Sequence, residues 1–385
     1  MTYCKSRRGL STVLFTDPEQ LPEDWKKLIP EGHFLFGPLL HNPDLHCFPG
    51  IRMILVLVYQ HEKPVAAAYF QYYRLHQDTF DTSKLGALRQ LGWSAIHRLL
   101  KPGLLVAGHL FRHDIHSFYA IPGTGDFEAY QYYKSAIDTA LRKTCAGAVL
   151  VKDLPESLAV LFQNHAPQYL LLRNDISMEL EIREEWSDLH DYEKALKHKY
   201  AQRFRKIRSS WRNVEVRELD ATGVSEQQDL IFALYQQVSY RQPVRLGFLS
   251  KHYIPALKRL HPEQFHVWMV YENGHSVAFF SAWVKAEVFD MFYIGMDYSR
   301  NEQLQLYFNM LFFAVDQAIA AGKKRLILGR TALEAKARLG CQPRYLSSFL
   351  YIRNPVLRRI VTAVQHRLQL QEGDWAARHP FKDIR

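Results

Sequence analysis

The sequence predicts an α/β protein of two similar domains, and three observations lead to this fold class. The chain has 385 residues, enough for two domains of ordinary size. In its second half, the apolar stretch Phe289–Met296, the amphipathic helix Arg300–Ala321 and the short strand Arg325–Leu328 form a strand–helix–strand unit. Such a unit builds parallel sheet and presents its functional loops at the carboxyl ends of the strands. The third observation is an internal repeat of this element order.

The repeat relates two hairpins and two helix–strand segments. VYQHEKPVAAAYF, from Val58, matches VYENGHSVAFF, from Val270, 212 residues later. The segment that begins at Tyr130 matches the one that begins at Tyr307, 177 residues later. The two offsets differ by 35 residues, about the length of an insertion in the first half. We therefore expect a duplicated domain.

The duplication predicts one domain in residues 1–183 and a second in residues 184–385. Apolar runs rich in aromatic and β-branched residues indicate strands, and apolar positions at helical spacing indicate helices. In the first domain these are a hairpin (Ile54–Tyr59 and Val65–Tyr73), a helix (84–100), a strand (Leu104–Phe111), a helix (Phe127–Lys143), a strand (Ala148–Val151) and a strand within Tyr169–Ile182.

The second domain is predicted to begin with a basic helix over Trp186–Arg212. The strand–helix–strand unit is then framed by a strand (Val214–Leu219), a helix (Ser225–Gln242), a hairpin (Phe265–Tyr271 and Val277–Lys285), a strand (Leu346–Ile352) and a basic helix from Pro355. We expect the apolar face of this C-terminal helix to pack against the second domain. Contact with an anionic membrane surface is the alternative.

The composition favours a folded, basic protein. The formal net charge is +10, which favours an anionic partner such as a phosphate-bearing donor, tRNA or an anionic membrane. No apolar run reaches the roughly 20 residues that span a bilayer, and the first residues lack a signal-peptide core, so we expect a cytoplasmic protein without a transmembrane segment. The four cysteines are scattered without metal-type spacing, so no metal site is predicted from them. The histidines of GHLFRHDIHSF (His109, His113 and His116) are interpreted as polar residues on a loop or strand edge, with a metal site as the alternative.

The segment after the strand Arg325–Leu328 carries a family pattern. A GRT tripeptide is followed by a lysine, a glycine and a proline; the residues are Gly329, Arg330, Thr331, Lys336, Gly340 and Pro343. In this pattern and its position the chain resembles the GNAT superfamily of acyl-CoA N-acyltransferases, in its FemABX-like branch of tandem domains. The resemblance implies two tandem GNAT-like domains, each a mixed central sheet flanked by helices.

The resemblance also implies an N-acyltransferase that moves an acyl or aminoacyl group from an activated donor to an amine on a small molecule or peptide. The donor is a co-substrate (acyl-CoA, acyl carrier protein or aminoacyl-tRNA), and no tightly bound cofactor is expected. Typical members hold the coenzyme A pyrophosphate with a glycine-containing loop at a helix amino terminus. The corresponding loop here, Asp297–Gln303, has no glycine, which argues against ordinary coenzyme A binding.

Candidate site residues lie near the strand ends of the second domain, which is expected to bear the site. Asp290 and Asp297 flank the central strand, and either is a candidate general base, with Tyr293 expected to point into the same region. Donor contacts are predicted for Arg330, Thr331, Lys336, Tyr307, Arg203 and Arg205. Each also has a structural alternative. Arg330 could form a salt bridge, Thr331 could cap the following helix, and the arginines of the basic helix could lie on a solvated helix face.

Two other functions remain open. One is a long-chain N-acyltransferase that makes an amino-acid lipid, with the basic C-terminal helix at the membrane surface. The other is a degenerate, non-catalytic GNAT-like binding protein, which the lack of a typical phosphate loop in both halves favours.

Overall fold

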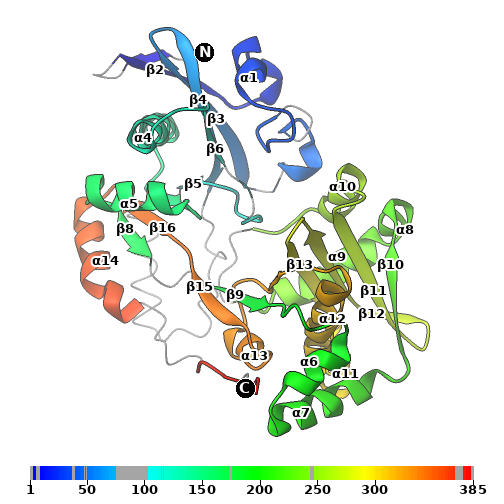
Figure 1. Cartoon of the computed structure of the whole chain (residues 1–385). Helices are drawn as coiled ribbons and strands as arrows, with labels where there is room; N and C mark the ends of the chain where they lie inside the picture. The colour runs from blue at the N-terminus through cyan, green and yellow to red at the C-terminus, as the bar shows by residue number, and fades with distance from the viewer. Residues whose placement is uncertain are drawn as a thin grey trace, which may run out of the picture. The chain divides into compact units, whose positions relative to one another are not determined.

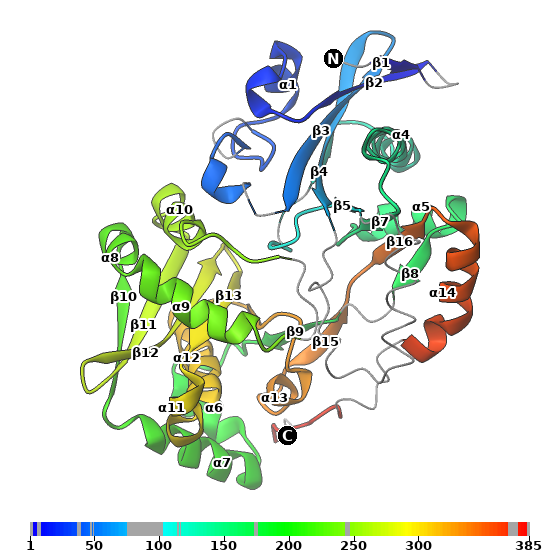
Figure 2. The same cartoon turned by 180° about the vertical axis from the view of Figure 1, so that it is seen from behind.

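The computed structural model describes residues 3–5, 9–36, 40–46, 48, 50–74, 103–113, 115, 117–172, 176–242, 247–368 and 376–382. These residues form two compact units, and each unit has one mixed sheet flanked by helices (Figures 1 and 2). The predicted fold class is therefore confirmed. Within the described residues, no helix combines the length and the apolar character that crossing a bilayer requires.

The division into units differs from the expected boundary between residues 183 and 184. The strand β9 (Ile176–Glu181) belongs to the second unit, whereas β16 (Ser348–Ile352) and α14 (Pro355–Leu368) belong to the first. Each unit therefore takes a strand from the other half of the chain, and the C-terminal helix is part of the first unit rather than the second. The first unit comprises residues 1–174, 243–250 and 346–369, and the second 175–242, 251–345 and 370–385.

Nine described strands form the sheet of the first unit, in the order β1-β2-β3-β4-β5-β7-β16-β8 with β6 beside β4. Strands β5 and β7 are parallel, and the other pairs are antiparallel. The strands other than β16 are β1 (Tyr3–Lys5), β2 (Leu10–Phe15), β3 (Ile51–Gln60), β4 (Lys63–Tyr73), β5 (Leu104–Ala107), β6 (Phe118–Ala120), β7 (Ala148–Val151) and β8 (Leu170–Leu172).

Helices cover both faces of this sheet. α4 (Asp126–Thr144) and α5 (Glu156–His165) pack on one face, where apolar residues such as Ile137 meet residues of β3 and β4. α1 (Glu23–Leu28) covers the other face with Trp25. Cys145 ends α4 in the left-handed conformation. The predicted helix over 84–100 lies outside the described residues.

Seven described strands form the sheet of the second unit, in the order β10-β11-β12-β13-β14-β9-β15. Strands β13 and β14 are parallel, and the other pairs are antiparallel. The predicted strand–helix–strand unit is thus present. The strands other than β9 are β10 (Val214–Leu219), β11 (Phe265–Glu272), β12 (His275–Val284), β13 (Val288–Met296), β14 (Arg325–Ile327) and β15 (Gln342–Tyr345).

The helices of the second unit also lie on both faces of its sheet (Figures 1 and 2). Residues of α6, α7 and α12 share one hydrophobic core with alternate residues of the strands, whereas α9 crosses the opposite face at Gly295. The helices are α6 (Leu189–Ala195), α7 (His198–Arg208), α8 (Ala221–Glu226), α9 (Gln228–Ser239), α10 (Tyr253–Leu260), α11 (Tyr298–Leu304), α12 (Leu306–Ala320) and α13 (Leu333–Ala337).

Two helices predicted as continuous are broken. Gln305 adopts the left-handed conformation, with φ of 48°, and separates α11 from α12. In the basic segment, Leu196 and Lys197 are extended and separate α6 from α7. Helical spacing of apolar residues continues on either side of both breaks, so the periodicity alone does not reveal them.

The internal repeat is visible in the backbone of the two hairpins. The register of β3 and β4 shifts between Val58 and Tyr59, and that of β11 and β12 shifts between Val270 and Tyr271, again 212 residues later. The turns correspond as well, because the first turn has positive φ at two successive residues and so does the second. These are His61 (48°) and Glu62 (63°) in the first hairpin, and Asn273 (49°) and Gly274 (80°) in the second.

Replacing the first turn by the sequence of the second is expected to stabilise the protein. Two successive positive φ angles suit Asn-Gly, whereas a residue with a Cβ in the left-handed region costs about 1–2 kcal/mol. The double variant His61→Asn/Glu62→Gly should raise the free energy of unfolding by about 1 kcal/mol, measured by urea denaturation. The reverse exchange, Asn273→His/Gly274→Glu, is the matched control and should lower it. Equal effects of the two exchanges would contradict this expectation.

Candidate functional site

In the second unit, the parallel strands β13 and β14 part from each other. Their last paired residues are Asp290 and Ile327, after which β13 continues to Met296 while β14 ends. The remainder of β13 runs beside β12. Ligands of α/β sheets commonly bind at the carboxyl ends of parallel strands, so the parting of β13 from β14 is a candidate ligand position.

A β-bulge in β13 lies just beyond the last parallel pair. The register between β12 and β13 shifts so that Ser281 faces two residues, Phe292 and Tyr293. The Ser281 hydroxyl donates to the Tyr293 carbonyl and accepts from the Tyr293 N–H, each at 3.1 Å. Strict alternation along β13 would put Asp290 and Tyr293 on opposite faces. The bulge adds one residue and brings both side chains to the same face.

That face is the one covered by α9 and α10. The Tyr293 ring meets Tyr235 of α9 and Tyr253 of α10 edge-on, with ring centroids 5.7 and 6.4 Å apart. Asp290 is 2% exposed. Gly295 permits the close approach of α9, because a Cβ there would lie 2.5 Å from the backbone nitrogen of Tyr235. This face therefore carries a buried carboxylate and a cluster of tyrosine rings.

Asp297 is part of a helix cap. Its carboxylate accepts hydrogen bonds from the N–H and the hydroxyl of Ser299, at 2.9 and 2.7 Å, at the amino terminus of α11. A carboxylate therefore already caps the amino terminus of α11. Thr331 is exposed, and the N-cap of α13 is Ala332, so the alternative of Thr331 as that cap is wrong.

Lys336 lies on the opposite face of the sheet, in the core around α12. It is 3% exposed and belongs to α13, the short helix that follows β14. Burial lowers the pKa of its ammonium to about 8, while the neighbouring Cys341 acts in the opposite direction. Burial also raises the pKa of the Cys341 thiol to about 12, so this thiol is neutral at physiological pH. No carboxylate among the described residues offsets the lost solvation of Lys336.

The predicted donor-binding arginines have different surroundings. Arg205 forms an ion pair with Glu193 at 3.4 Å, which favours a structural role. Arg203, two residues earlier on α7, instead lies over the ring of Phe308, 5.1 Å from its centroid. Arg330 follows Gly329, which has φ of +77°, directly after β14, and its side chain is half-buried.

The candidate residues therefore divide between the two faces of the second sheet. Asp290 and Tyr293 lie on the α9 face, whereas Lys336 and Tyr307 pack with the core around α12. Burial, and then Cys341, raise the pKa of Tyr307, so its hydroxyl stays protonated at neutral pH. The parting of β13 from β14 lies between the two groups.

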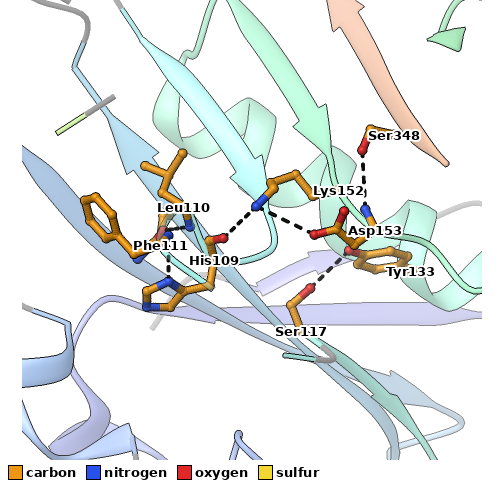
Figure 3. A network of polar contacts seen from close by, with 9 residues as sticks. His109, Leu110, Phe111, Ser117, Tyr133, Lys152, Asp153 and Ser348 are labelled. Carbon is orange, nitrogen blue, oxygen red and sulfur yellow. Dashed lines mark hydrogen bonds and ion pairs between the residues drawn. The ribbon is translucent and has the colours of Figure 1, made fainter. Parts of the chain in front are cut away.

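The first unit has a polar network at the corresponding strand ends, which the sequence analysis did not assign (Figure 3). Beyond the last parallel pair of β5 and β7, the Lys152 N–H donates to Ala107 and its ammonium donates to the His109 carbonyl at 2.9 Å. The same ammonium lies 3.7 Å from Asp153. Gly108, with φ of +140°, makes the turn. The rule that ligands gather at the ends of parallel strands could have indicated both dipeptides, Gly108-His109 and Lys152-Asp153.

His109 is held as a neutral ring in this network. Its Nδ1 accepts from the Phe111 N–H at 3.1 Å, which leaves the proton on Nε2. Burial, followed by the charges of His46, Arg112 and Lys152, lowers its pKa well below the usual value. Within the described residues no group of three metal-ligating side chains occurs, and His116 lies outside them. These contacts support the interpretation of this segment as a polar loop.

No protein-family model and no curated protein sequence matches the chain. Solved structures are similar to it at low identity. The structure of L-PGS from Bacillus licheniformis is 12% identical, with 85% of this chain and 91% of that chain covered and a TM-score of 0.48. FemX is 9% identical, with 81% and 91% covered and a TM-score of 0.47. A tandem GNAT protein from the clavulanic acid biosynthesis pathway is 10% identical, with 90% and 99% covered and a TM-score of 0.46. At these values the likeness concerns the fold and assigns no role to any residue.

Proposed function

We propose that the protein transfers an acyl or aminoacyl group from an activated donor to an amine. The observation that carries this proposal is Lys336, a lysine 3% exposed in the short helix that follows β14, with no carboxylate of the described residues to offset its buried charge. A buried lysine with a perturbed pKa and no carboxylate partner is more typical of a functional site than of a structural core. Its place in the GRT…K pattern supports the same interpretation.

In the proposed reaction the amine nitrogen attacks the donor carbonyl, a C–N bond forms, and the C–S or C–O bond to the donor breaks. The amine must lose a proton and the leaving group must gain one. Lys336 would contact the anionic part of the donor from the α12 side, with Tyr307 as a neutral hydroxyl donor nearby. Asp290 is the preferred base, because Asp297 already serves as a helix cap. Tyr293 would contact the amine substrate on the α9 side.

A panel of donors tests the function. Purified protein is incubated with labelled acetyl-CoA, a long-chain acyl-CoA, an acyl carrier protein and an aminoacyl-tRNA, each with a mixture of amines. Native mass spectrometry of the protein as isolated detects any donor that copurifies. Consumption of one donor class with formation of an amide supports the proposal. If no donor binds or is consumed, the non-catalytic alternative replaces it.

Long-chain transfer at a membrane is the second candidate, and one observation favours it. The described part of α14 exposes Val356 and Ile360, at 62% and 52%, one turn apart and beside Arg359. An apolar stripe next to basic residues is typical of helices that lie on anionic lipid. The long-chain donor is therefore tested with and without anionic phosphatidylglycerol vesicles. Vesicle-dependent transfer would select this candidate.

Replacing Lys336 by methionine is expected to stabilise the protein and impair the reaction. Methionine fills a similar volume without a charge, and a shift from the ordinary lysine pKa to about 8 corresponds to a cost of about 3 kcal/mol at neutral pH. Lys336→Met should raise the free energy of unfolding at pH 7 by an amount of that order, measured by denaturant titration. Donor binding should weaken at least tenfold, because the ammonium is lost.

The pH dependence of stability gives an independent check. The unfolded chain binds the Lys336 proton more tightly than the folded one, so Lys336 makes stability rise with pH above about 8. Above about pH 9 the raised pKa of Cys341 opposes this rise, so wild-type stability should increase between pH 8 and 9. Lys336→Met should lack this rise. The exposed lysine variant Lys206→Met should keep both the rise and the donor affinity. A less stable Lys336→Met protein with unchanged transfer would make Lys336 a structural residue.

A further inference from the structure

Strand β3 extends beyond the strand that pairs with it on one side. The last pair of β2 with β3 joins Phe15 to Leu55, and β2 ends there. On the other side, β4 stays paired with β3 as far as Ile51, which lies opposite Tyr73. Among the described residues, the first four residues of β3, Ile51–Ile54, therefore have a partner strand only on the β4 side. We call this segment the open edge of β3.

A cavity of about 700 Å³ lies along the open edge. All four residues of the edge line it, together with the chain that follows β2, residues of the segment 40–46 and the end of α4 at Lys143 and Thr144. Successive residues of a strand point to opposite faces of a sheet, so a cavity that meets four in a row meets the edge of β3 and not one face. Its volume lies in the range of pockets that hold ligands, about 300–1,000 Å³.

The backbone of the open edge directs hydrogen-bonding groups at the cavity. The Gly50 carbonyl accepts from the Arg74 N–H at 3.1 Å, so the even-numbered residues of β3 bond to β4 and the odd-numbered ones face the other side. The Ile51 N–H already donates to the Phe48 carbonyl at 3.0 Å. Among the described residues, the N–H and the carbonyl of Met53 and the carbonyl of Ile51 are thus left for a further strand to pair with.

The charged side chains of the cavity favour an anionic partner. Its two carboxylates are engaged, because Asp17 accepts from the Glu19 N–H at 2.9 Å and Glu19 itself pairs with His41 at 2.7 Å. The exposed cations Arg52 and Lys143 have no carboxylate partner among the described residues, and the recorded contact of Arg52 is an aromatic ring of β4. The cavity therefore offers two positive charges that a carboxylate can approach.

We propose that this cavity binds an extended acidic peptide, which adds to β3 as a strand in the place that β2 leaves. In this mode of binding, main-chain hydrogen bonds give affinity and alternate side chains give specificity. Ile54 and, by alternation, Arg52 lie on the α4 face, whereas Met53 lies on the opposite face with Leu40. Peptide residues that bond to Met53 share its face and should be apolar. The residues between them face α4 and should be acidic.

This site is separate from the strand ends described above. α4 ends at Thr144, and the Gly147 N–H donates to the Gly103 carbonyl at 2.9 Å, immediately before β7 and β5 begin. The cavity at the end of α4 therefore lies toward the amino ends of β5 and β7, whereas His109 and Lys152 follow their carboxyl ends. The proposed transfer uses residues of the second unit, so the peptide is a partner in addition to the donor and the amine.

Isothermal titration of the full-length protein with the acetylated peptide amide Val-Asp-Val-Asp-Val tests the proposal. Two isomeric probes carry N-methyl groups on two of the valines or on the two aspartates. In the proposed register the valine N–H groups donate to β3, so methylated valines should weaken binding about tenfold or more. Methylated aspartates keep these hydrogen bonds, and the affinity should change less than about threefold. Equal weakening by the two isomers would overturn strand addition.

Charge reversal of Arg52 tests the acidic preference. Arg52→Glu should weaken the Val-Asp peptide about fivefold or more and should strengthen binding of the analogue Val-Lys-Val-Lys-Val. Lys27→Glu is the matched control, because Lys27 is an exposed cation of α1 in the same unit and does not line the cavity; it should change either affinity less than about twofold. Thermal melting verifies that both variants are folded.

Decanoate is the competing probe, since a small acid with an apolar tail also matches an apolar cavity with cations. If decanoate binds and the Val-Asp peptide does not, or if the wild type binds neither, the proposal is overturned. The probes carry no activated acyl group, so the outcome is independent of whether acyl transfer is found.

Discussion

Neither half of the chain, cut between residues 183 and 184, is expected to fold when it is produced alone. The C-terminal half lacks β9, which lies between β14 and β15 and buries Met178 and Leu180. The N-terminal half lacks β16, which lies between β7 and β8. Losing a central strand removes two rows of hydrogen bonds and part of the core, more than the roughly 5–15 kcal/mol by which a domain is stable. Circular dichroism and denaturant titration should show no cooperative transition for either half.

Two further experiments test whether the exchanged strands cause this result. The two halves, refolded together, should recover a cooperative transition, because each supplies the strand that the other lacks. A fragment spanning residues 175–345 keeps all seven described strands of the second sheet and should unfold more cooperatively than residues 184–385. A folded, cooperative 184–385 fragment would show that β9 is dispensable.

The substitution Gly295→Ala is expected to destabilise the second unit strongly. The new Cβ would lie 2.5 Å from the backbone of both Leu234 and Tyr235, and 2.4 Å from the Phe279 ring. Because backbone atoms of α9 cannot rotate away, the helix must shift as a whole. Overpacking of this kind costs about 3 kcal/mol or more, which urea denaturation would detect as a lower midpoint with an unchanged slope.

Gly223→Ala in α8 is the matched control. Its Cβ would meet the nearest atom, an oxygen of Asp220, at 3.4 Å, and alanine is the better helix former by about 1 kcal/mol. This variant should be neutral or more stable. Since Gly295 sets the distance between α9 and β13, Gly295→Ala should also displace Tyr235 from Tyr293 and reduce any transfer activity. A loss below about 1 kcal/mol in Gly295→Ala would mean that α9 adjusts easily.

The fold class was predictable because it depends on local pattern. Apolar runs gave the hairpins, and the Val58 and Val270 repeat extends to equivalent β-bulges and turns. The strand exchange was not predictable from local pattern. Strands β8 and β9 are separated by only three residues, the usual spacing of a hairpin, yet each pairs with strands from elsewhere in the sequence. The competing pairings have the same apolar character, so only tertiary packing distinguishes them.

The candidate site was predictable in part. The strand ends and the position of Lys336 follow from the pattern, but its burial depends on how α13 folds back on the core. The bulge that turns Tyr293 to the face of Asp290 adds one residue to β13 without interrupting its apolar and aromatic run, so the sequence does not reveal it.

The exchanged strands also determine when the first sheet can be completed during synthesis. Strand β7 pairs with β16 through Val151 and Phe349, which are about 200 residues apart. At translation rates of about 5–20 residues per second, the edge of β7 waits about 10–40 s for its partner. An unpaired strand edge is a template for association with other chains. We therefore expect aggregation, or protection by a chaperone, during synthesis, after β7 has been made and before β16 is available to pair with it.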